Sequence, residues 1–134
     1  MHTVFRNPTT IIYADKRAKI NMRVSMERGI NQGNPLSADL FNIVQADAIA
    51  ETMRTNPLSS ILSFIDDHYL LGTVENNIAA CTDLSKALLP LGLEIANNKS
   101  EIFSYTELTA ADARLASQHN IQYDPEARGI TVVG

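Results

Sequence analysis

Two adjacent carboxylates, Asp66 and Asp67, are the residues of this sequence best suited to chemistry. They lie within LSFIDDHYLLG, residues 62–72, between two runs of apolar and β-forming residues. Mg²⁺ prefers oxygen ligands and takes one or two protein carboxylates together with waters and substrate phosphates. Two such ions, about 3.5–4 Å apart, can activate an attacking hydroxyl group and stabilise a leaving pyrophosphate. The pair could therefore supply part of such a site for Mg²⁺, for which Mn²⁺ could substitute, but two carboxylates seldom make up the whole site.

An ordinary turn explains the same two residues without any metal ion. Aspartate tolerates a left-handed backbone, and its side chain hydrogen-bonds to nearby backbone groups, so many hairpins carry it at the tip. Short motifs also match by chance. The choice between these two interpretations depends on the rest of the chain.

The elements around the pair are predicted from the spacing of apolar residues. Residues 59–65 and 68–74 predict two strands joined at Asp66-Asp67. A helix is predicted to begin at Pro35 to Ser37 and to end near Thr55, because apolar side chains recur there at helical spacing. These apolar residues are Leu40, Phe41, Val44 and Ala48. A second helix is predicted over residues 75–91, ended by Gly92.

Shorter segments complete the prediction of the fold. The predicted strands are residues 9–13 (which also fit a helix end), 18–30 (a bent strand or hairpin), 93–95, 101–105 and 129–134. A capping-box pattern from Thr109 to Asp112 predicts a short helix to about Gln118. Tight connections between neighbouring strands favour antiparallel pairing. The sequence therefore predicts an α+β fold, an antiparallel sheet with helices packed on one face.

Composition narrows the class of protein. With 134 residues, 45% of them hydrophobic and 19% charged, the chain is expected to fold as a single domain with a buried core. No run approaches the roughly 18 apolar residues of a membrane span, and no secretory signal precedes the fold. We therefore expect an intracellular protein without membrane contact, cytoplasmic or nuclear, with an organelle left open. Cys81 is the one cysteine and is interpreted as a small apolar residue on a helix.

The charge of the chain bears on nucleic-acid binding. The formal net charge is −4, and DKRAK, residues 15–19, is the one cluster of basic residues. Proteins that bind nucleic acid by neutralising phosphates are usually basic. The chain alone is therefore expected to bind nucleic acid weakly, unless metal ions or a further basic part supply positive charge.

Four blocks stand in an order that resembles the palm of reverse transcriptases, the RNA-directed DNA polymerases. The likeness is to those of non-LTR retrotransposons and group II introns in particular. The blocks are RGINQGNPLSADLFNIV (28–44), FIDD (64–67), LGLEIANNKSEIFS (91–104) and ITVVG (130–134). The resemblance spans roughly residues 11–134 and implies a polymerase palm-like fold.

The resemblance also implies roles for particular residues. Asp66 and Asp67 would be catalytic metal ligands, and Lys99 would lie near the leaving pyrophosphate, although a solvated turn lysine explains Lys99 equally well. Nucleotide or template binding would fall to Arg28, Gln32, Gly33 and Pro35. A strand-to-helix turn is the alternative explanation for that second group, since glycine and proline are common in turns.

The chain departs from the family pattern near its beginning. In the family, a first catalytic carboxylate lies on an earlier strand, but only 27 residues precede Arg28, and Asp15 is the only acidic residue before Glu27. We therefore interpret residues 1–134 as a partial palm domain without fingers, first catalytic strand or thumb.

Two hypotheses about function follow from the resemblance. In the first, the intact parent is a nucleotidyltransferase that copies an RNA template onto a DNA primer from deoxynucleotides by two-metal catalysis, and the chain alone is inactive. In the second, the chain is a non-catalytic palm remnant that serves as a binding or assembly module. In either case a missing strand would expose a sheet edge, through which the chain could form a homo-oligomer.

Overall fold

The chain divides into two compact units, Met1–Ser37 and Ala38–Gly134. The structure, a computed structural model, describes residues 9–15, 20–26, 35–127 and 129. The strand predicted over residues 129–134 therefore lies, apart from Gly129, outside the described residues. Each unit is described below by itself.

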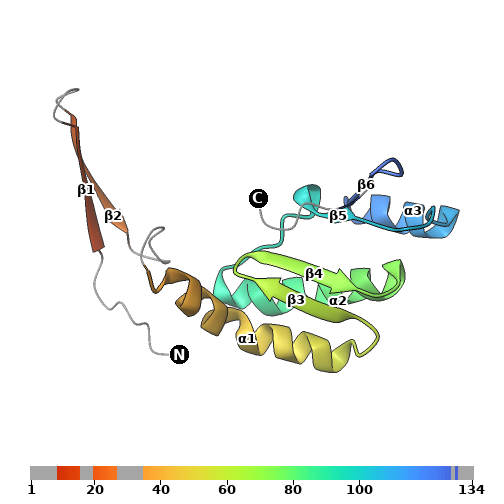
Figure 1. Cartoon of the computed structure of the whole chain (residues 1–134). Coiled ribbons are helices and arrows are strands. Elements are labelled where there is room, and N and C mark those ends of the chain that lie inside the picture. Colours follow the sequence, from red (N-terminus) through yellow and green to blue (C-terminus); the bar gives the residue numbers. More distant parts are fainter. Residues whose placement is uncertain (1–8, 16–19, 27–34, 128, 130–134) are drawn as a thin grey trace. The chain divides into compact units, whose positions relative to one another are not determined.

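The first unit contains one antiparallel hairpin (Figure 1). Strand β1, Thr9–Asp15, pairs with β2, Ile20–Met26, in a register that sets Thr9 opposite Met26 and Asp15 opposite Ile20. Of the two interpretations left open for residues 9–13, the strand is confirmed. The β-branched residues of TTIIY favour a strand, because branching at Cβ suits an extended backbone.

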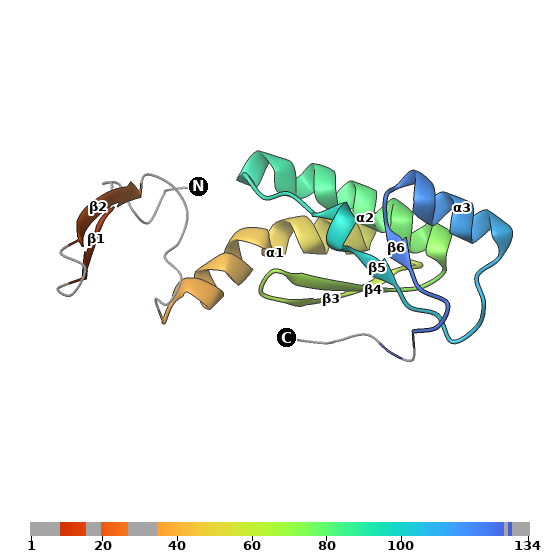
Figure 2. The same ribbon diagram turned by 90° about the horizontal axis from the view of Figure 1, so that it is seen from above.

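The second unit is built on two helices that lie on the same side of a hairpin (Figure 2). Helix α1 spans Ser37–Thr55 and α2 spans Val74–Leu88, close to the predicted bounds. A short 3-10 helix, η1, Leu89–Leu91, extends α2 and ends at Gly92. Gly92 has φ 77°, a left-handed conformation that costs glycine little and that explains why the helix ends there.

The hairpin consists of β3, Ser60–Phe64, and β4, Asp67–Leu71, which pair antiparallel. Its residues alternate between two faces, as strand geometry requires. Ile61 is buried on the inner face, whereas Leu62 and Phe64 are exposed on the outer face.

The core of the second unit lies between the helices. Ala48 of α1 packs with Leu84 and Leu88 of α2 in a buried cluster. Leu93 and Ile95 pack against this cluster from the segment that follows α2. Residues 93–95 were predicted as a strand, and this prediction is wrong: the side chains alternate between half-buried and exposed, but no neighbouring strand pairs with them in the described part of the chain.

The last part of the chain differs most from the predicted fold. A 3-10 helix, η2, Asn97–Lys99, precedes β5, Glu101–Ile102, which is shorter than the predicted strand 101–105. Helix α3, Ala110–Gln118, follows. The unpredicted strand β6, Gln122–Tyr123, then pairs parallel with β5. The pairing is parallel because α3 lies between the two strands and returns the chain in the same direction.

The fold class is α+β, as predicted, but the strands are arranged differently from the prediction. Over the described residues the strands form three separate two-stranded sheets rather than one antiparallel sheet. The start of α3 does follow the predicted capping box: the Asp112 N–H donates to Thr109 Oγ1 at 3.1 Å, and Thr109 Oγ1 donates to Asp112 Oδ2 at 2.7 Å.

Candidate metal site at the β3–β4 turn

The turn of the hairpin consists of Ile65 and Asp66, because Phe64 pairs with Asp67 across the strands. The sequence prediction of an antiparallel hairpin is confirmed, but the turn is one residue earlier than predicted, and Asp67 is the first residue of β4. Ile65 has φ 56°. Hairpin turns of two residues favour positive φ at their first position, because that geometry matches the twist of the strands. A β-branched residue rarely adopts it.

Both carboxylates of the candidate site are exposed to solvent. In the described residues, no group of three or more His, Cys, Asp and Glu side chains is arranged to hold a metal ion. At the turn, Asp66 and Asp67 therefore offer a cation two carboxylates without a third. Water and substrate phosphates would have to supply the remaining ligands.

A buried glutamine of α1 supports the turn from the inner side. Gln45 is 1% exposed, and its Nε2 donates to the Ile65 carbonyl oxygen at 2.6 Å. Weaker contacts at 3.4 and 3.3 Å join the same nitrogen to Ser63 Oγ and Asn42 Oδ1. The other amide atom, Oε1, is buried, and no residue in the described part of the chain forms a hydrogen bond with it. Helix α1 therefore touches the turn through a polar group.

Sequence reasoning missed Gln45, although a signal was present. Phe41, Gln45, Ala48 and Thr52 recur at the helical spacing of a buried face, and Gln45 is the largest polar side chain among them. A buried polar residue on an apolar face needs a hydrogen-bond partner, so it indicates a specific tertiary contact. Its partner, the backbone of Ile65, could not be named from the sequence.

His68 makes a further polar contact on the inner face of the hairpin. Its Nδ1 lies 3.0 Å from Ser63 Oγ, the residue that pairs with it across the hairpin. Burial lowers the pKa of His68 below its ordinary value of 6.5, while the negative charges of Asp66 and Asp67 oppose this shift. His68 is therefore held mainly in its neutral form near pH 7.

At its open end the hairpin is tied to α2 by Asn77. The Asn77 Nδ2 donates to the carbonyl oxygens of Leu70 at 3.1 Å and Gly72 at 3.3 Å. Its Oδ1 accepts a hydrogen bond of 2.7 Å from Ser59 Oγ. A Cβ atom at Gly72 would lie 2.8 Å from Asn77 Oδ1, so this close approach requires glycine.

Of the other predicted site residues, Lys99 and Pro35 lie in the part of the chain that the structure describes. Lys99 is exposed on η2, and in the described part of the chain no hydrogen bond or ion pair joins it to either aspartate. Pro35 is exposed and belongs to the first unit. Arg28, Gln32 and Gly33 lie outside the described residues.

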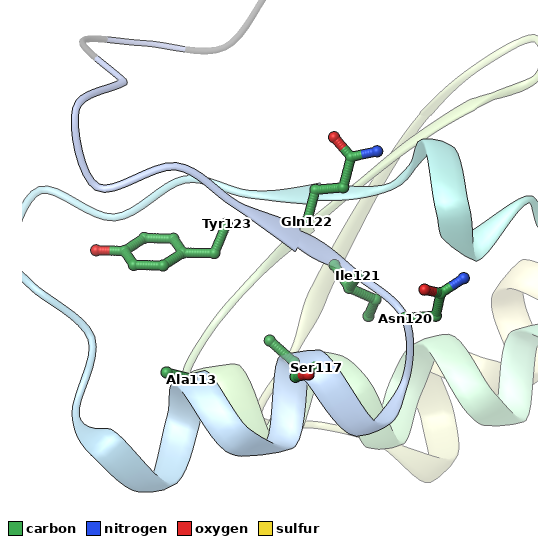
Figure 3. A pocket seen from close by; sticks show the side chains of 7 residues that line it. Ala113, Ser117, Asn120, Ile121, Gln122 and Tyr123 are labelled. Carbon is green, nitrogen blue, oxygen red and sulfur yellow. The ribbon is translucent and has the colours of Figure 1, made fainter.

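A pocket of about 290 Å³ lies elsewhere, between α3 and β6 (Figure 3). Figure 3 shows Ala113 and Ser117 on the helix and Ile121 on the side toward them, whereas the Gln122 side chain points away from the helix. The only titratable side chain in its lining is Tyr123, whose hydroxyl oxygen accepts from the Leu108 N–H at 3.4 Å. This pocket shares no residue with the acidic turn.

Comparison of the chain with known protein families, with curated proteins and with solved structures gave no match. Over the residues that the structure describes, no helix is long and apolar enough to cross a membrane. The fold and site define an α+β protein with a hairpin that ends in an exposed acidic turn and that side-chain amides tie to two helices.

Proposed function

We propose that this chain is the palm portion of a reverse transcriptase, whose intact parent synthesises DNA on an RNA template. The observation that carries the proposal is the exposed Asp66-Asp67 pair at the end of an antiparallel hairpin. The order of the four sequence blocks adds support: α1 begins within the first block, and the second block, residues 64–67, falls at the turn of the hairpin.

The chemistry proposed for the parent is transfer of a nucleotide to the end of a DNA primer. Mg²⁺, or Mn²⁺ in its place, would supply activation of the primer hydroxyl and charge neutralisation at the leaving pyrophosphate. In this proposal Asp66 and Asp67 hold the ion, and Lys99 balances negative charge on the pyrophosphate. Arg28, Gln32, Gly33 and Pro35 contact the nucleotide or template.

The chain by itself is proposed to be inactive. Two carboxylates without a third replace too little of the hydration shell of Mg²⁺ for tight binding. A net charge of −4 gives little attraction for a primer–template duplex. Activity would therefore need the further catalytic carboxylate and the basic surfaces of a larger protein.

A Mn²⁺ titration followed by NMR tests the metal site. Millimolar Mn²⁺ should broaden the amide signals of residues 65–68 in the wild-type chain and much less in Asp66→Asn. Asp47→Asn is the matched control, because Asp47 is an exposed carboxylate on α1 away from the turn. Equal broadening in all three proteins would contradict a metal site at the turn.

Primer extension tests the proposed inactivity. The chain with template, primer, deoxynucleotides and Mg²⁺ should incorporate no nucleotide. Incorporation that Asp66→Asn abolishes would show that the chain is active by itself.

The second candidate function is a non-catalytic palm remnant that assembles with a second copy of the chain. Its support is the outer face of the hairpin, where Leu62, Phe64 and Leu71 are 60%, 54% and 55% exposed. Apolar side chains grouped beside a strand edge favour association. Sedimentation velocity of the wild type against Leu62→Ser should show dimers that the substitution weakens, whereas a wild-type monomer at tens of micromolar would contradict assembly.

A further inference from the structure

Gln45 is the least expected residue in the buried part of α1. It is 1% exposed, and its Oε1 has no hydrogen-bond partner among the residues that the structure describes. A buried acceptor without a partner destabilises the folded state, and an apolar side chain of the same size would avoid that loss. The unpaired oxygen therefore offsets part of the stability that the amide nitrogen of Gln45 contributes through its hydrogen bonds.

The orientation of the Gln45 amide follows from its neighbours. Ile65 offers a carbonyl oxygen, which can only accept, so the amide nitrogen and not the oxygen must face it. The 2.6 Å distance is the shortest that Nε2 makes, against 3.3 Å to Asn42 Oδ1 and 3.4 Å to Ser63 Oγ. The main interaction of this side chain is thus with the backbone of the turn.

The turn needs such an interaction because of Ile65. Ile65 has φ 56°, and a β-branched residue rarely adopts a positive φ because its side chain then crowds the backbone. Unusual backbone conformations persist where the surroundings hold them in place. The Gln45 hydrogen bond holds the Ile65 carbonyl toward α1, and the next two residues are the exposed Asp66 and Asp67.

We propose that Gln45 is a positioning residue, which fixes the backbone of Ile65 and thereby sets the direction in which Asp66 and Asp67 present their carboxylates. The metal-binding part of this inference rests on the proposed function. The part that concerns the turn does not. Gln45 itself lies on the buried side of the hairpin and is not a metal ligand.

The test uses Gln45→Met, which keeps the length and much of the volume of the side chain but removes both the donor and the unpartnered acceptor. Asn42→Ala is the matched control, because Asn42 is an exposed partner of the same amide and does not bond to the turn. Three properties are measured for each protein: the thermal unfolding midpoint, the NMR signals of Ile65, and Mn²⁺ broadening at Asp66 and Asp67. A positive φ brings the amide and α protons of one residue close together, so Ile65 should give a strong NOE between them.

In Gln45→Met the unfolding midpoint should change little, because the loss of the donor to the Ile65 carbonyl and the removal of the unpartnered acceptor have opposite effects on stability. The Ile65 NOE should weaken, and the Mn²⁺ concentration for half broadening should rise about fivefold, the effect of losing one hydrogen bond. Asn42→Ala should match the wild type in the NOE and the broadening.

Two results would overturn the proposal. One is an Ile65 NOE and Mn²⁺ response in Gln45→Met equal to those of the wild type. The other is a large fall in the unfolding midpoint, since Gln45 would then serve mainly for stability. If the wild-type turn does not bind Mn²⁺ at all, the proposed function fails, but the Ile65 NOE still decides whether Gln45 positions the turn.

Discussion

The two ends of the β3–β4 hairpin are tied to different helices by the same chemical group. At the turn, the Gln45 amide of α1 donates to Ile65, and at the open end the Asn77 amide of α2 donates to Leu70 and Gly72. The acceptor oxygen of Asn77 is also used, whereas that of Gln45 is not. The open end therefore satisfies its polar groups, and the turn end leaves one unsatisfied beside two exposed carboxylates.

The Asn77 contact at the open end is thus a structural one, whereas the Gln45 contact at the turn includes an unpaired buried oxygen that costs stability. Buried polar groups are normally paired, and an unpaired one requires an explanation. Residues that serve binding or catalysis often reduce the stability of the fold. We therefore expect substitutions at the open end to affect mainly the free energy of unfolding, and substitutions at the turn to affect mainly metal binding.

The largest effect on stability is expected from Asn77→Leu. This substitution removes three hydrogen bonds and leaves the hydroxyl of Ser59, which is 4% exposed, without its acceptor. The free energy of unfolding should fall by about 3 kcal/mol. Urea denaturation measures this change, with Asn76→Ala as the control on the same helix.

Asn77→Leu also tests whether the turn of the hairpin behaves independently of the open end. If Asn77→Leu still folds, its Mn²⁺ broadening at Asp66 and Asp67 should equal that of the wild type. A loss of metal binding in this variant would mean that the two ends of the hairpin are coupled, and the separation between them would be wrong.

The next largest effect is expected from Gly72→Ala. The added Cβ would lie 2.8 Å from both Asn77 Oδ1 and the Leu58 carbonyl oxygen. Because one of these atoms belongs to the backbone, relief requires a shift of the chain, and we expect a loss of about 2 kcal/mol. Gly129→Ala is the control, because a Cβ there meets nothing within 4 Å. Equal unfolding midpoints for the two variants would show that the contact at Gly72 relaxes freely.

A smaller effect on stability is expected from the two serines that lie beside the Asn77 and Gln45 amides. Ser59 is buried and donates to Asn77 at 2.7 Å, whereas Ser63 is exposed and lies 3.4 Å from the Gln45 nitrogen. Ser59→Ala should lower the free energy of unfolding by about 1 kcal/mol, the usual net value of one hydrogen bond. Ser63→Ala should lower it less. The opposite ranking in urea denaturation would contradict the assignment of the open end as the structural one.

The local parts of the fold could be predicted from the sequence. Helix α1, the end of η1 at Gly92 and the cap of α3 at Thr109 each depend on residues within a few positions of one another. Such short-range patterns fix backbone conformation directly. The hairpin was also predicted, since two β-forming runs flank Asp66 and Asp67.

The contacts between distant residues could not be predicted. The hydrogen bond from Gln45 joins residues 20 positions apart, and the parallel pairing of Glu101 with Gln122 depends on how α3 packs. The turn was misplaced by one residue because nothing in the sequence around Ile65 indicates a positive φ. The aspartates could thus be named from the sequence, but not the glutamine that supports their turn.

The smallest effect we predict is a pH dependence of stability that arises at the turn end alone. Burial, the larger influence, lowers the pKa of His68 below 6.5, and the charges of Asp66 and Asp67 oppose the shift. The unfolded chain therefore binds a proton more readily than the folded chain, so this contribution to stability is present above about pH 6.5 and is lost as the pH falls through the lower, folded pKa. Urea midpoints measured between about pH 7.5 and 5.5 should decline in the wild type and decline less in His68→Gln. His119→Gln is the control, and a decline that His119→Gln rather than His68→Gln reduces would place the titrating group outside the turn.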